Sequence, residues 1–159
     1  MSRLTAETAQ FLEGPNSIMV ASHDAGLVPA IARAVALRCA PDGRHLTVFL
    51  PTGAAAEVLA QLRADPCVAV VAELVSTHRT LQVKGRVATL APTPLHERPF
   101  IEGAVAAFFE VCAQIGLPRR LTERLVRWPT ISVEIAIEQV FEQSPGPGAG
   151  EPLGGAPAS

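Results

Sequence analysis

Arg33 stands where a charged side chain is not expected, and it is the first candidate for chemistry. It belongs to LVPAIARAVALRCA, residues 27–40, where strand alternation places it in line with Ile31, Val35 and Leu37. A guanidinium on an apolar face needs a partner of opposite charge or access to water. We therefore expect an anionic ligand such as a phosphate group, an ion pair with Glu134 or Glu138, or a rim position open to solvent.

A second place suited to an anion is LPTGAAAEVLAQLRADP, residues 50–66. It predicts the end of a strand, a turn and a helix that stops at Asp65 and Pro66. The backbone N–H groups of residues 53–55 would face a ligand at the helix start, where the helix dipole favours negative charge. The only charged residue in the first turn is Glu57. The turn has the pattern of a phosphate site without a cation.

Several other charged or aromatic side chains could bind a ligand or have only a structural role. Arg38 shares a predicted face with alanines and is expected at the surface. The segment RRLTERLVRWP contains Arg120, Arg124 and Arg127, which on a helix would form a solvated charged face or reach the ligand site of a second copy of the chain. Trp128 would either plug the core or stack on a flat ring.

No pattern in the sequence predicts a metal ion or a nucleophile. The histidines form no HxxxH or HxH pair, and the three cysteines form no CxxC pair and have apolar neighbours, as buried thiols do. No GxSxG, Walker or GxGxxG motif is present. We therefore expect no metal, and no catalytic residue can be named.

Composition narrows the class of protein and its partners. The chain has 159 residues and a net charge of -2, which gives no electrostatic attraction to nucleic acid or an anionic membrane. No signal peptide or apolar run of membrane-spanning length is found, which predicts a cytoplasmic protein. Because 48% of the residues are hydrophobic and 18% charged, part of the surface is expected to pack against a second copy, in a homodimer.

The predicted elements that position these residues are mostly strands. We expect a helix at 5–13, three strands at 17–23, 27–40 and 45–50, and the helix that ends at 64. Strands at 67–74 and 80–90, a helix at 94–115 and a strand at 130–141 follow, with a bulge or a close backbone approach at Gly85. This order favours a six-stranded antiparallel barrel with peripheral helices, of the α+β class. Residues 1–143 would form one domain, and 144–159, rich in Pro, Gly and Ala, a mobile tail.

Five short stretches carry a resemblance to a known family. They are RAVALR at 33–38, FLPT at 49–52, ADPCVAVV at 64–71, VKGRV at 83–87 and VFEQSPGPGAG at 140–150. In type and spacing they resemble the pyridoxamine 5'-phosphate oxidase-like, FMN-binding split-barrel family over roughly residues 15–145. The resemblance implies a six-stranded split barrel and a homodimer with two flavin sites at the subunit interface.

The resemblance also implies which residues would contact FMN. Arg33 and Thr52 stand where the family holds the flavin phosphate, and Thr80 aligns with a glutamine that meets the flavin. The implied cofactor-binding set is Arg33, Val35, Leu50, Thr52, Gly53, Thr80 and Gln82.

The sequence departs from the family pattern at two places. The vitamin-making oxidases have Ser-Arg-Lys where this chain has Ala56, Glu57 and Val58, so both cations are missing. The arginine that holds the pyridoxal substrate is also absent, since no Arg or Lys follows Arg127. Synthesis of pyridoxal phosphate is therefore not expected.

Two functions follow from these expectations. The first is a small FMN-dependent oxidoreductase, in which the flavin supplies the hydride chemistry and Thr52, Thr80 or Gln82 bond to its ring. The alternative is a split-barrel module that has lost FMN and binds another ligand, such as haem or a deazaflavin, or only a protein partner. Arg33 and Thr52 favour the first, and the turn without cations favours the second.

Overall fold

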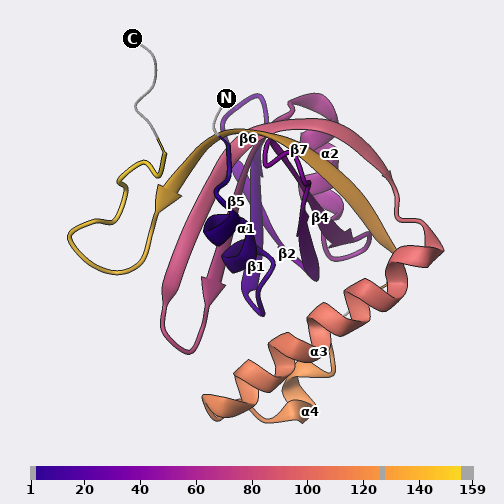
Figure 1. Ribbon diagram of the computed structural model, residues 1–159. Coiled ribbons are helices and arrows are strands. Elements are labelled where there is room, and N and C mark those ends of the chain that lie inside the picture. The colour runs from indigo at the N-terminus through magenta and orange to yellow at the C-terminus, as the bar shows by residue number, and fades with distance from the viewer. Residues whose placement is uncertain (1–2, 126–127, 155–159) are drawn as a thin grey trace.

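The fold is a strongly curled antiparallel sheet with helices at its ends and on one side (Figure 1). A computed structural model describes residues 3–125 and 128–154. The elements in chain order are α1 (Ala6–Leu12), β1 (Ser17–His23), β2 (Pro29–Ala34), β3 (Ala36–Cys39), β4 (His45–Pro51), α2 (Ala56–Ala64), β5 (Cys67–Leu74), β6 (Arg79–Pro92), η1 (Leu95–Glu97), α3 (Arg98–Gln114), α4 (Arg119–Thr122) and β7 (Thr130–Glu142).

The sheet closes on itself through a single residue. Its strand order is β2-β1-β5-β6-β7-β4-β3, so β2 and β3 form the two edges. These edge strands are consecutive in the chain and only Val35 lies between them, donating its N–H to the Phe49 carbonyl oxygen at 2.9 Å. The predicted barrel is confirmed. The sheet has seven strands rather than six because the predicted strand 27–40 breaks at Val35.

The break at Val35 also exchanges the two faces of this segment. Before it, Ala30, Ala32 and Ala34 pack into the barrel core, whereas after it Leu37 does so. Ala36 instead packs into a second cluster outside the barrel. The prediction of one uninterrupted alternation through 27–40 was therefore wrong, because a strand that leaves one sheet edge for the other cannot keep one face inward throughout.

The barrel core is built from one face of each strand and closed by α1 and α2. Leu12 of α1 and Val58, Leu59 and Leu62 of α2 belong to the core cluster, as the helical spacing predicts. A buried polar contact holds α2 in place. Ser22 Oγ donates to Gln61 Oε1 at 2.7 Å, and Gln61 Nε2 donates to the Val28 carbonyl oxygen at 3.3 Å.

A second, smaller core lies under α3, outside the barrel. It joins Ala36 and Phe49 of the sheet to Ile101, Val105 and Phe109 of α3. In Figure 1, α3 and α4 lie together beside the curled sheet. Phe109 is buried and Phe108 only partly so. The helix begins at Arg98, and Pro99 is tolerated in its first turn.

Gly85 lies at an irregularity between β6 and β7. Lys84 pairs with Gln139 and Gly85 with Ile137, so Glu138 is an extra residue on β7. A Cβ at position 85 would overlap the Ala136 carbonyl oxygen. Both predicted features of Gly85, a bulge and a close backbone approach, are confirmed. The bulge turns two consecutive side chains of β7, Glu138 and Gln139, outward.

The segment after β7 folds back beside it. Leu153 donates its N–H to the Val140 carbonyl oxygen at 2.8 Å, and Pro152 forms a bridge with Phe141. Residues 155–159 lie outside the described part, and the domain boundary at 143 stays a prediction. None of the described helices is long and apolar enough to cross a bilayer.

Candidate functional site

Arg33 projects from the outer face of β2, and the described residues give it no acidic partner. Its Nη1 donates to Ser17 Oγ at 2.8 Å, and its Cζ lies 5.7 Å from the centroid of the Phe108 ring. Among the described residues, no carboxylate lies within ion-pair distance of it. Glu134, one of the partners considered from the sequence, accepts instead from Thr89 Oγ1 at 3.0 Å. Arg33 is thus a half-buried cation whose charge is not balanced by the described part of its own chain.

The turn after β4 is partly as the sequence predicts. Thr52 directs both its N–H and its hydroxyl at the Pro129 carbonyl oxygen, at 3.0 and 3.3 Å. The Ala55 N–H, predicted to face a ligand, instead donates to the Pro51 carbonyl oxygen at 3.0 Å. Gly53 is exposed and a Cβ there would meet nothing within 4 Å. The turn therefore keeps open space at Gly53, but fewer N–H groups than expected.

Two residues of the turn that depart from the family pattern face opposite ways. Glu57 is exposed, while Val58 is 1% exposed and packs in the core. Leu50 is likewise fully buried in the barrel core, so only its backbone is available to a ligand. Val35 is partly buried at the point where the barrel closes, against the α3 cluster.

The remaining predicted residues, Thr80 and Gln82, lie at the beginning of β6 beside the C-terminal segment. Thr80 donates its N–H to Ser144 Oγ at 2.9 Å, and Gln82 Oε1 accepts from Gln143 Nε2 at 3.4 Å. Thr80 and Thr52 are far apart, because β4 meets the first residues of the 13-residue strand β7 and this end of β6 meets its last. About 40 Å of strand length separates the two groups.

Arg33 and Gln82, in contrast, share one row across the outer face of the sheet. The pairing runs from Arg33 to Met19, then to Val71, then to Gln82. Three strand spacings separate the ends of this row, about 14 Å. The structure thus places Thr52 and Gly53 far along β7 from Thr80 and Gln82, and places Arg33 across the sheet from Gln82.

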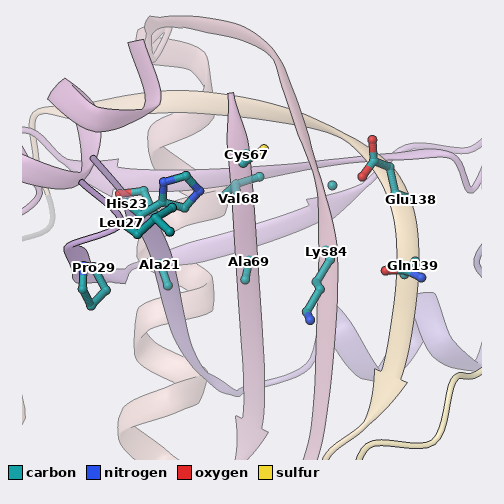
Figure 2. A pocket seen from close by; sticks show the side chains of 12 residues that line it. Ala21, His23, Leu27, Pro29, Cys67, Val68, Ala69, Lys84, Glu138 and Gln139 are labelled. Atoms are coloured by element: carbon teal, nitrogen blue, oxygen red, sulfur yellow. The ribbon is translucent and has the colours of Figure 1, made fainter. Parts of the chain in front are cut away.

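A hollow in the described surface lies one row along from Arg33 and Gln82. Its volume is about 520 Å³, which lies within the range of about 300–1,000 Å³ for ligand pockets. Figure 2 shows His23, Leu27 and Pro29 at one side, Glu138 and Gln139 at the other, and Ala69 and Lys84 between them. By comparison, the cavity that a single chain encloses beside Arg33 measures about 20 Å³, which is room for about one water molecule.

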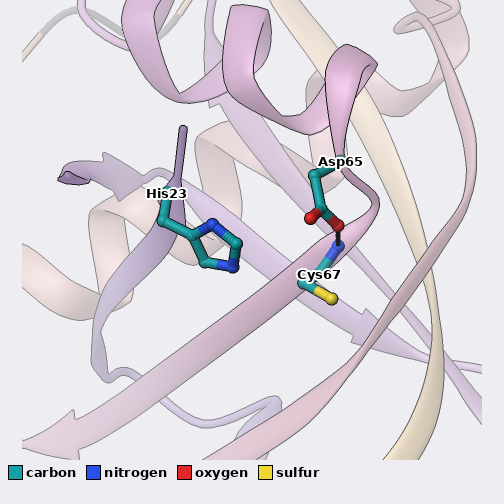
Figure 3. Close-up of side chains that lie close together, drawn as sticks. All are labelled: His23, Asp65 and Cys67. Atoms are coloured by element: carbon teal, nitrogen blue, oxygen red, sulfur yellow. Dashed lines mark hydrogen bonds between the residues drawn. The ribbon is translucent and has the colours of Figure 1, made fainter. Parts of the chain in front are cut away.

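Three side chains at the edge of this hollow come together in a way that the sequence analysis missed. His23, Asp65 and Cys67 place one potential ligand atom each within 4.8 Å of the others (Figure 3). The antiparallel pairing of β1 with β5, in which Ala21 faces Ala69, brings them together. Two residues further along, the last residue of β1 comes opposite the first of β5. A prediction of that register would have been needed to find the cluster from the sequence.

Hydrogen bonds set the charge states within this cluster. Asp65 Oδ1 accepts the Cys67 backbone N–H at 2.9 Å, and this bond is the main cause of the lowered pKa of the Asp65 carboxyl. A hydrogen bond to that carboxylate raises the pKa of the Cys67 thiol, and Arg86 partly opposes the effect. Cys39 differs, because burial raises the pKa of its thiol to about 12.

The other candidates from the sequence have structural contacts. Arg38 Nη1 forms an ion pair with Glu97 Oε1 at 2.8 Å and its Cζ lies 4.0 Å from the Phe100 ring centroid. Trp128 packs partly buried against the α3 cluster. Arg120 and Arg124 are exposed, and Arg127 lies outside the described residues.

Comparison with known proteins identifies relatives of this architecture. A family model described as pyridoxamine 5'-phosphate oxidase matches residues 4–144. No curated protein sequence matches the chain.

Solved structures with the same fold have low sequence identity. A candidate pyridoxamine 5'-phosphate oxidase of Lactobacillus delbrueckii is 19% identical with a TM-score of 0.56, covering 87% of this chain and 93% of that one. An FMN-binding protein of Syntrophomonas wolfei is 13% identical with a TM-score of 0.54, covering 85% and 83%. A protein named F420 reductase is 15% identical with a TM-score of 0.57, covering 86% and 98%. At these identities the likeness establishes the fold alone.

Proposed function

The chain belongs to the pyridoxamine 5'-phosphate oxidase family, and on that premise we propose that it binds FMN between two copies of itself as a small oxidoreductase. The observation that carries the proposal is Arg33, a half-buried guanidinium with no carboxylate partner among the described residues, in one outer row with Gln82. A phosphate is the kind of group that such a cation binds.

The residues that would hold FMN fall into two groups, and this supports a homodimer. Arg33 with the turn at Thr52 and Gly53 would take the phosphate, and Thr80 and Gln82 would bond to the flavin ring. The turn at Thr52 and Gly53 lies far along β7 from Thr80 and Gln82. One chain therefore does not bring the turn and these two residues to the same FMN, and a second copy would supply its Thr80 and Gln82 beside the turn of the first. Bound flavin supplies hydride transfer, while the chain binds, orients and excludes water.

FMN added to the purified chain is expected to bind at one molecule per chain. Binding should perturb the visible flavin spectrum and, at a ligand concentration of about 100 times Kd, raise Tm by about 5–10 °C, because it stabilises only the folded state. Riboflavin, which lacks the phosphate, is the matched control and should bind more weakly. A chain whose Tm ignores millimolar FMN would contradict the proposal.

The turn without cations favours a second candidate, a ligand other than FMN. Each charge-assisted contact to phosphate is worth about 1.5–3 kcal/mol, so the two missing cations at Glu57 and Val58 weaken a phosphate site substantially. Parallel titrations with a deazaflavin and with haem separate the candidates. A spectral change and a rise in Tm with only one of these ligands would identify the occupant and replace FMN in the proposal.

Substituting Ile31→Asp is expected to weaken the proposed homodimer at least about tenfold, since a buried interface anchor is worth over 1 kcal/mol. Ile31 is 64% exposed on the outer face of β2, next to the exposed Leu27 and Val28. Light scattering across a dilution series measures the change. Leu95→Asp is the control, because Leu95 is 75% exposed on η1, at the start of the α3 arm. A monomeric wild-type chain at every concentration would exclude the homodimer.

A further inference from the structure

His23 comes from one part of the chain and Asp65 and Cys67 from another, and the three side chains meet at one point. His23 is the last residue of β1, Asp65 follows α2, and Cys67 opens β5. All three are partly buried, and their ligand atoms lie within 4.8 Å of one another. Figure 3 shows the ring of His23 pointing toward Asp65 and Cys67. The pairing of β1 with β5 brings His23 to Asp65 and Cys67, which are close together in the sequence.

The hydrogen bonds around the cluster leave one nitrogen of His23 and one oxygen of Asp65 able to coordinate a metal ion. His23 Nδ1 lies 3.0 Å from the Asp24 carbonyl oxygen, which can only accept, so Nδ1 carries the proton and Nε2 keeps its lone pair. Metal-binding histidines have this arrangement. Asp65 uses Oδ1 for the Cys67 backbone N–H and has a second oxygen. The same bond holds Asp65 and Cys67 in fixed relation.

The three ligand types together favour one class of ion. Imidazole, thiolate and carboxylate are the ligands of Zn²⁺, whereas Ca²⁺ and Mg²⁺ prefer oxygen alone. Ligand atoms around a tetrahedral zinc ion lie about 3.3–3.8 Å apart, given bond lengths of about 2.0–2.3 Å. Small side-chain rotations would close the present separations to these values.

We propose that His23, Asp65 and Cys67 bind a zinc ion whose fourth coordination position opens onto the neighbouring hollow. His23 and Cys67 line that hollow, together with Lys84 and Glu138. Zinc sites with three protein ligands keep one position for water or a substrate, unlike closed structural sites with four. On binding, the Cys67 thiol loses its proton to solvent and the thiolate bonds to the ion.

The positive charge of Arg86 is compatible with a metal ion at this site. Its Nη1 lies 3.3 Å from Cys67 Sγ, where its charge stabilises the thiolate. Carboxylate and thiolate together carry two negative charges and Arg86 one positive charge. Once the thiol has lost its proton on binding, the three ligands and Arg86 together carry one net negative charge for a divalent cation, and the neutral imidazole adds no repulsion.

The test uses the full chain, kept reduced and stripped of metal by a chelator. Zn²⁺ is titrated against a chromogenic competing chelator, and Co²⁺ replaces it for spectroscopy. We expect one ion per chain and a thiolate-to-cobalt charge-transfer band in the near ultraviolet. Cys67→Ser should remove that band, and Cys67→Ser and His23→Gln should each lower Zn²⁺ affinity about 100-fold.

Two matched controls remove the same residue types elsewhere. His45→Gln breaks a comparable pair, in which His45 Nδ1 lies 2.9 Å from Asp42 Oδ2, and Cys39→Ser removes another thiol. Both should bind Zn²⁺ as the wild type does. Should Cys67→Ser fail to fold, His23→Gln decides the matter. The proposal is overturned by the lack of stoichiometric binding, by a cobalt band that survives Cys67→Ser, or by unchanged affinity in His23→Gln. The FMN titration gives its answer independently of this one.

Discussion

Replacing Gly85 with alanine is expected to destabilise the fold by about 3 kcal/mol or more, the upper range for overpacking a rigid site. The added Cβ would overlap the Ala136 carbonyl oxygen and lie 3.0 Å from Ile135 Cγ2. The first of these is backbone inside a paired strand and cannot move as a flexible side chain does. Relief requires β6 and β7 to separate, although they share the most extensive pairing in the sheet.

Urea unfolding measures this loss, and two other glycines serve as controls. Gly53 and Gly103 have open space where a Cβ would lie. Gly103→Ala lies inside α3 and should stabilise the chain by up to about 1 kcal/mol, because glycine is a poor helix former. Gly53→Ala should change little. If Gly85→Ala unfolds at the same urea concentration as the wild type, the close approach of β6 and β7 at this point is wrong.

The bulge at Gly85 links the stability of the barrel to the shape of the hollow. Glu138 is the additional residue that the bulge places on β7, and it turns outward together with Gln139. Both line the hollow beside Lys84. A regular pairing of the two strands would direct one of these side chains into the barrel, so the wall of the hollow depends on the bulge.

Much of the barrel could be predicted from the sequence, because each strand buries one face. The alternation in residues 80–87 and the apolar positions Val133, Ile135 and Ile137 of β7 agree with the structure, whereas the alternation predicted on to residue 90 breaks at a shift of register between Val87 and Thr89. The break at Val35 could not be predicted, since alanines and leucines fit either face and only closure of the sheet decides between them. The burial of Phe109 rather than Phe108 likewise depends on how α3 sits against Phe49.

The candidate sites were predictable only in part, for a similar reason. Arg33 could be singled out because it is a charged side chain among the apolar residues of a predicted strand, which is a signal in the local sequence. The cluster of His23, Asp65 and Cys67 has no local signal that includes His23, because 41 residues separate His23 from Asp65 in the chain. Strand register brings them together, and register is what a single sequence specifies least.

Replacing Arg33 with alanine is expected to weaken FMN binding about 10–150-fold, the equivalent of one charge-assisted contact of about 1.5–3 kcal/mol. FMN titration of the variant measures the change. Riboflavin affinity should stay the same, because riboflavin carries no phosphate for Arg33 to hold. Arg33→Lys should recover part of the loss, since it keeps the charge but not the planar pair of donors.

A purely structural role for Arg33 makes a different prediction. Arg33 also donates to Ser17 Oγ, and Ser17 is only 9% exposed, so Arg33→Ala costs about 1 kcal/mol of stability in either case. The ratio of FMN to riboflavin affinity separates the two roles, because lost packing weakens both ligands alike. Arg38→Ala is the matched control: its guanidinium has Glu97 and Phe100 as partners, and it should leave the ratio unchanged. An equal ratio in Arg33→Ala and the wild type would assign Arg33 to the scaffold and remove the main support for a phosphate at this face.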